Sequence, residues 1–210
     1  WEVSSVTDMS YMFLNTHHFN QPLNDWNVSN VTSMESMFQV AYVFNQPLND
    51  WDVSNVTNMS AMFILAKKFN QDISSWDVSR VTNMSYMFSS TDWFNQDISS
   101  WDVSQVTNMS AMFKDAESFN NGNNQGKSNI PLNWDVSNVT NMKSMFKGAE
   151  SFNSDISNWT VSQETNMENM FKDAIRFKQP LCEENGWKTT VNYGKRTKII
   201  NCYTATLPPT

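Results

Sequence analysis

The best-preserved repeat of the chain begins Trp76-Asp77-Val78-Ser79-Arg80-Val81-Thr82-Asn83-Met84-Ser85-Tyr86-Met87-Phe88 and ends Phe94-Asn95-Gln96-Asp97-Ile98-Ser99-Ser100. Its tryptophan recurs at positions 1, 26, 51, 76, 101, 134 and 159, so steps of 25 residues are interrupted once by a step of 33. All 14 methionines lie in Met-x-x-Met pairs, and a phenylalanine follows each pair. A fixed period of about twenty to fifty residues is typical of chains that stack one structural unit per repeat. The sequence therefore predicts seven stacked coils.

Two apolar spacings alternate within each repeat. Ile73, Trp76 and Val78 have the spacing of a leucine-rich-repeat strand, in which alternate apolar residues point inward. From Val81 the spacing changes to three and four, which predicts an amphipathic helix of about ten residues. We therefore predict an α/β solenoid, a leucine-rich-repeat-like stack of seven 25-residue strand-helix coils.

Two further columns of residues support stacking. The position that ends the apolar stripe is always small: Thr16, Ala41, Ala66, Thr91, Ala116, Ala149 and Ala174. A second column reads Asn20, Asn45, Asn70, Asn95, Asn120 and Asn153. We expect these amides to form a ladder that satisfies backbone groups at the turn between coils.

The pattern divides the chain into two parts. Residues 1–177 form the seven-repeat solenoid, in which the eight-residue insertion 121–128 should loop out without disturbing the stack. Residues 178–210 form a C-terminal cap and linker, in which 189–193 and 198–200 read as a hairpin. Cys182 and Cys202 both lie there; a disulfide between them would fit an exported protein, and two free thiols are the alternative.

Composition excludes several classes of function. The net charge of −7 and the pI of 4.7 argue against a nucleic-acid partner. No apolar run reaches the roughly eighteen residues of a spanning helix, and the chain opens at Trp1 without a leader, so we expect a mature product or an excised fragment without membrane insertion. His17 and His18 are the only imidazoles, and no triad, metal motif or phosphate loop occurs, so we expect no catalysis.

The unit Trp-Asp-Val-Ser-x-Val-Thr-x-Met-x-x-Met-Phe, with Phe-Asn-Gln-x-Ile/Leu-x-x-Trp, resembles the 25- to 26-residue repeat of BspA-like bacterial surface proteins. The resemblance covers residues 1 to about 181 and implies export, cell-surface display and adhesion or receptor-like binding. It carries no catalytic residues. The insertion, the degenerate seventh unit and the cap depart from the family pattern. Leu207-Pro208-Pro209-Thr210 matches the start of a sortase signal, which a Pro-rich linker explains as well.

An acidic column follows the tryptophans. It contains Asp52, Asp77, Asp102 and Asp135, to which Asp50 adds charge two residues before Asp52. Stacked coils would place these carboxylates about 5 Å apart, where they repel unless cations, waters or hydroxyls intervene. Calcium, which prefers clustered oxygen ligands, is the candidate metal, and the alternative is a solvated acidic face without a cofactor.

The residues that vary between repeats are the ones free to make contacts. In the first four repeats the segment after Met-Phe contributes seven large apolar or aromatic residues, namely Leu14, Val40, Tyr42, Val43, Ile64, Leu65 and Trp93. We call these seven residues the edge strip, and exposed apolar patches of this kind tend to mark interfaces. The alternative is that some turn inward or cover a missing neighbour.

These observations predict a monomeric, extracellular cell-surface module that binds a protein or glycan through the edge strip. The alternative is a structural spacer or a self-associating surface element, with calcium as a further stabilising possibility.

Overall fold

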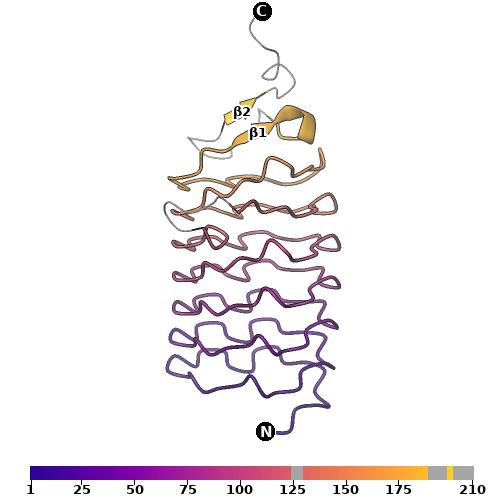
Figure 1. Ribbon diagram of the computed structural model, residues 1–210, viewed down its shortest axis with the longest axis vertical. Helices are drawn as coiled ribbons and strands as arrows, with labels where there is room; N and C mark the ends of the chain where they lie inside the picture. Colours follow the sequence, from indigo (N-terminus) through magenta and orange to yellow (C-terminus); the bar gives the residue numbers. More distant parts are fainter. Residues whose placement is uncertain (124–129, 189–197, 201–210) are drawn as a thin grey trace, which may run out of the picture.

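The computed structural model describes residues 1–123, 130–188 and 198–200. Coils of similar outline stack in chain order from the N-terminus to a C-terminal cap (Figure 1). Isolated parallel bridges join one residue of each coil to its counterpart in the next, and they run through Asp8, Ser33, Asn58, Asn83, Asn108, Asn141 and Asn166. The register holds across the insertion, because Asn108 pairs with Asn141. Residues 124–129 lie outside the described part.

The predicted α/β solenoid of leucine-rich-repeat type is wrong. The regular elements among the described residues are strand β1 (Pro180–Cys182), the 3-10 helix η1 (Glu183–Asn185) and strand β2 (Lys198–Ile200), all in the cap. Strand-helix coils would need a strand around Trp76 and a helix from Val81, and neither forms. The Trp76 amide instead donates to the carbonyl of Ile73 at 3.2 Å, which closes a turn.

In the segment predicted as a helix, every second amide donates its hydrogen bond to the neighbouring coil. The amides of Met84, Tyr86, Phe88 and Ser90 donate to carbonyls of the next coil at 2.7–2.9 Å. The intervening amides of Met87 and Ser89 close turns onto residues three positions earlier. Tyr86 and Ser90 have φ angles of 58° and 54°, which a right-handed helix does not contain. The three-and-four apolar spacing therefore comes from turns that alternate with bonds between coils.

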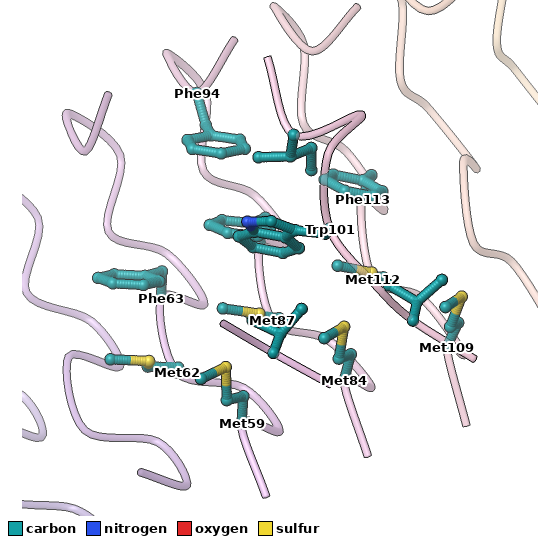
Figure 2. Close-up of a cluster of buried hydrophobic side chains, with 14 of the residues drawn as sticks. Met59, Met62, Phe63, Met84, Met87, Phe94, Trp101, Met109, Met112 and Phe113 are labelled. Carbon is teal, nitrogen blue, oxygen red and sulfur yellow. The ribbon is translucent and has the colours of Figure 1, made fainter. Parts of the chain in front are cut away.

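Identical side chains stack on one another in the core. Phe63, Phe88 and Phe113 have ring centroids 5.6 Å apart from coil to coil, and Phe88 also stacks on Phe94 at 4.0 Å. Figure 2 shows the methionine pairs of three successive coils at repeating positions, beneath the labelled rings of Phe63, Trp101 and Phe113. The Trp76 indole donates to the Leu48 carbonyl at 3.0 Å, and indoles at the same position in other coils make the equivalent bond.

The asparagine ladder is confirmed, and the small-residue column lies in the core. The alanines from Ala41 to Ala174 in that column are buried. Each asparagine side-chain oxygen accepts the backbone N–H of the asparagine one coil later, at 2.8–2.9 Å. In the last coil Asn153 accepts the amide of Lys178 in the same way.

The cap covers the seventh coil. The Val161 amide donates to the Asn185 carbonyl at 2.8 Å, and Leu181 and Trp187 are buried. Gly186 has a φ of 88°, and a Cβ there would lie 2.0 Å from the Val161 carbonyl oxygen, so a glycine is required. Strand β2 pairs with β1 in parallel. The predicted hairpin between 189–193 and 198–200 is not tested, because residues 189–193 lie outside the described residues.

Cys182 is bonded in a disulfide. Cys202 and Leu207–Thr210 fall outside the described residues, so the predicted pairing and the sortase-like ending are not tested. No helix in the described part of the chain is long and apolar enough to cross a membrane.

Candidate functional site

The edge strip lies where neighbouring coils join through backbone hydrogen bonds. The Val40 amide donates to the Ile64 carbonyl at 2.8 Å, and the Lys68 amide donates to the Tyr42 carbonyl at 3.2 Å. The His17 ring stacks on Tyr42 with centroids 4.9 Å apart. Six strip residues are half-buried: Leu14, Val40, Tyr42, Val43, Ile64 and Leu65. Trp93 is the exception, with 56% of its surface exposed.

Two strip residues occupy left-handed backbone positions. Val40 has a φ of 63° and Leu65 a φ of 61°. In the other coils this position holds residues that are small or polar, namely Asn15, Ser90, Asp115, Gly148 and Asp173. Asparagine, aspartate and glycine adopt this conformation with little strain, whereas a β-branched or bulky residue is a genuine outlier there. Coils two and three therefore keep apolar side chains at a position that disfavours them.

Two lysines of the preceding coil hold Trp93 in place. Its amide donates to the Lys67 carbonyl at 3.1 Å, and the Lys68 Nζ lies 5.7 Å from the ring centroid. Lys67 in turn forms an ion pair with Asp92, with Nζ and Oδ2 3.4 Å apart. A cation over an indole face is attracted by the ring quadrupole. The ring is thus positioned while much of it stays open to solvent.

An open cavity of about 510 Å³ lies beside this ring. It is lined by Trp93 together with Asn70, Asn95, Gln96, Asp97, Ser118, Gly122 and Ile130. Sequence reasoning found the tryptophan but missed its polar neighbours, because most of them belong to the constant part of the repeat. The available signal was position: the Phe-Asn-Gln segment follows the variable segment directly, so the two must share one edge.

A second open cavity of about 610 Å³ continues toward the C-terminal coils. It shares Asn95 and Ser118 with the first, and Arg176 and Lys178 line its far end. The edge strip therefore opens at Trp93 into a polar groove that the sequence did not reveal.

The acidic column is engaged in local turns. Asp52, Asp77, Asp102 and Asp135 each accept the backbone amide of the serine two residues later, at 3.0–3.1 Å. Hydrogen bonds from the serine hydroxyl and amide hold the pKa of Asp77 and of Asp135 below the usual value. Asp50 instead accepts the side-chain amides of Asn24 and Asn49.

These five candidate metal ligands do not form a cluster. Among the described residues no group of three or more His, Cys, Asp or Glu side chains could hold a metal ion. The carboxylates of Asp52, Asp77, Asp102 and Asp135 close turns, as Asn27 does in coil two by accepting the Ser29 amide at 3.1 Å.

Comparison with known proteins gives one finding. No curated protein and no solved structure matches the chain. One family model, described as Mycoplasma protein of unknown function, DUF285, matches three overlapping stretches, residues 1–83, 48–131 and 122–201. Since these stretches together span most of the sequence and follow its internal repetition, the chain belongs to the DUF285 family.

Proposed function

We propose that this protein is a non-enzymatic, extracellular binding module that recognises a protein or glycan on a cell surface through the edge strip. The observation that carries the proposal is the left-handed conformation of Val40 and Leu65. Strained residues persist when the surrounding structure holds them, and they gather at sites of function. Apolar side chains at strained positions along one edge are expected of a contact surface, and a passive spacer has no need of them.

Two further observations support this proposal. Trp93 is both exposed and positioned, and tryptophan is enriched among the residues that dominate binding energy. Cys182 is disulfide-bonded, and disulfides persist mainly in oxidising compartments such as the extracellular space. We also place the repeat with the BspA-like surface proteins, on the motif that the two share.

Binding of the purified, fluorescently labelled chain to a panel of host cells tests the proposal. The test variant changes Tyr42, Val43, Ile64, Leu65 and Trp93 to Ser, and its melting temperature is measured alongside. A matched control changes Tyr86 to Ser, because this aromatic residue is 45% exposed and lies outside the edge strip. We expect saturable binding by the wild type and the control, and at least a tenfold loss in a folded strip variant. Equal binding by all three would refute the edge strip as the site.

A self-associating surface element is the second candidate, and the first coil favours it. There an open cavity of about 290 Å³ is lined by apolar residues that include Phe13, Phe19 and Leu23, beside Trp1, which is 88% exposed. Analytical ultracentrifugation separates the two candidates. Concentration-dependent growth that a Trp1→Ser variant abolishes would favour self-association, and a constant monomer mass would favour a binding module.

A further inference from the structure

The cavity beside Trp93 has the chemistry of a sugar-binding site. A pyranose presents C–H groups on its faces and hydroxyls around its rim, so it needs an aromatic surface beside fixed hydrogen-bond donors and acceptors. Trp93 supplies the aromatic surface, and amide, hydroxyl and carboxylate groups line the same cavity. From this combination we infer that the Trp93 cavity binds a neutral oligosaccharide. This inference rests on the proposed binding function and names its ligand class.

The polar groups of the cavity are fixed at one end. The Asn70 Oδ1 accepts the Asn95 amide at 2.9 Å and the Gln96 Nε2 at 2.8 Å. The Asp97 Oδ1 accepts the amide and hydroxyl of Ser99 at 3.0 and 2.7 Å. These bonds hold the side chains before a ligand arrives, which lowers the entropy cost of binding.

The opposite ends of the same groups have no partner among the described residues. They are the Nδ2 of Asn70, the Oε1 of Gln96 and the Oδ2 of Asp97, which make one donor and two acceptors. A hydroxyl both donates and accepts, so neighbouring sugar hydroxyls can satisfy such a mixed set. The apolar side chains of a protein ligand cannot satisfy these polar groups.

Within the Trp93 cavity itself, charge favours a neutral ligand over an anionic one. Asp97 is the ionised group that lines the cavity, and it repels carboxylates and sulfates. Lys67 is paired with Asp92, and Lys68 lies over the indole ring. The second cavity continues from Asn95 and Ser118, so the groove has room for an oligosaccharide longer than one unit; its cationic residues, Arg176 and Lys178, lie at the end away from Trp93.

Indole N–H signals in ¹⁵N NMR spectra report on this site directly. The indoles of the buried tryptophans donate to carbonyls within the stack, so a ligand at the edge should leave their signals in place. The signal of Trp93, assigned by its loss in Trp93→Phe, should shift saturably with cellohexaose, chitohexaose or maltohexaose. We expect Trp93→Ala to weaken binding at least tenfold. Asp97→Asn should weaken it about threefold, because the amide can still close the Ser99 turn while the open acceptor becomes a donor.

The same experiment can overturn the inference. It fails if none of the three oligosaccharides shifts the Trp93 signal, or if Trp93→Ala binds as tightly as the wild type while Tyr86→Ser serves as the unaffected control. Cell binding that depends on the edge strip, survives periodate and is lost after trypsin would identify a protein ligand, which overturns this inference and leaves the proposed function standing. Absence of any cell binding by the wild type would overturn the proposed function itself.

Discussion

In the interior, Phe63, Phe88 and Phe113 repeat one residue at one position with ring centroids 5.6 Å apart, whereas two residues further along the chain the same coils carry Leu65, Ser90 and Asp115. Main-chain bonds join the coils at both positions, and the two positions differ in whether the side chains also touch from coil to coil. Each phenylalanine ring touches its own counterparts, so a change in one coil disturbs both neighbours. At the edge, main-chain bonds join the coils whatever the side chain, as when the amides of Leu65 and Ser90 donate to the next coil at 2.9 and 2.7 Å.

This difference separates structure from recognition within one repeat. Interior positions are constrained by neighbours of the same kind, so their repetition reflects packing. Edge positions can vary without breaking a bond between coils, so their apolar residues in coils two to four need another explanation. Binding is the explanation that we propose, and the following variants test the separation from its strongest consequence to its weakest.

The largest expected effect is at Phe88. Phe88→Ala removes a ring that stacks on Phe63, Phe94 and Phe113, and it leaves a cavity in the middle of the stack. We expect a loss of about 3–5 kcal/mol of unfolding free energy, against less than about 0.5 kcal/mol for Trp93→Ala at the edge. Urea unfolding followed by circular dichroism measures both. Similar losses in the two variants would abolish the distinction between interior and edge.

A smaller effect is expected in the asparagine ladder. The Asn95 Oδ1 accepts the amides of Asn120 at 2.8 Å and Gly122 at 3.1 Å, so Asn95→Ala leaves two backbone donors without their acceptor. We expect a loss of about 1–3 kcal/mol in the same urea assay. Gln105→Ala, at an exposed surface position, is the control and should change stability by no more than about 0.5 kcal/mol. A ladder variant as stable as this control would show that water replaces the amide.

The interior was predictable from sequence because the same residue types recur there at fixed spacing. Fourteen methionines in fixed pairs and a repeated asparagine allow few arrangements other than stacked columns and a ladder. The local conformation was not predictable in the same way. Turns at Met87 and Ser89, alternating with bonds to the next coil, give the apolar spacing of a helix, so periodicity alone could not separate the two.

The candidate site was predicted only in part, for a related reason. Comparing the repeats found Trp93 because it differs between coils. The groups beside it, such as Asn70 and Gln96, are nearly constant, so the comparison assigned them to structure alone. Each of these side chains takes part in the ladder and also lines the cavity, and only coordinates show that one side chain does both.

The strain at the edge gives a sharper test with a smaller effect. Val40→Asn and Leu65→Asn place at these positions the residue type that Asn15 already provides in coil one. We expect the unfolding free energy to stay unchanged or rise by up to about 1 kcal/mol, because relief of left-handed strain offsets the lost apolar contact, while cell binding falls. The reverse change, Asn15→Val, should cost about 1 kcal/mol. If the asparagine variants are less stable than the wild type but bind cells equally well, Val40 and Leu65 serve packing and not binding.

The smallest effect concerns acid, and it asks whether the acidic column belongs with the interior. The pKa of Asp77 and that of Asp135 lie below the usual 3.8, because the hydroxyl and amide of Ser79 and Ser137 bind the carboxylates. A lowered folded pKa means that this stabilisation is present above the unfolded value of about 4 and is lost as the pH falls through the folded pKa. The double variant Asp77→Asn, Asp135→Asn should therefore lose less melting temperature than the wild type between pH 5 and 2, on the order of a degree. Asn27 closes the same turn in coil two, so asparagine can replace aspartate there. At pH 7 the melting temperature of the double variant should therefore match that of the wild type, with or without added calcium. If the double variant melts at a lower temperature than the wild type at pH 7 only when calcium is present, the acidic column binds metal and is not part of the structural core.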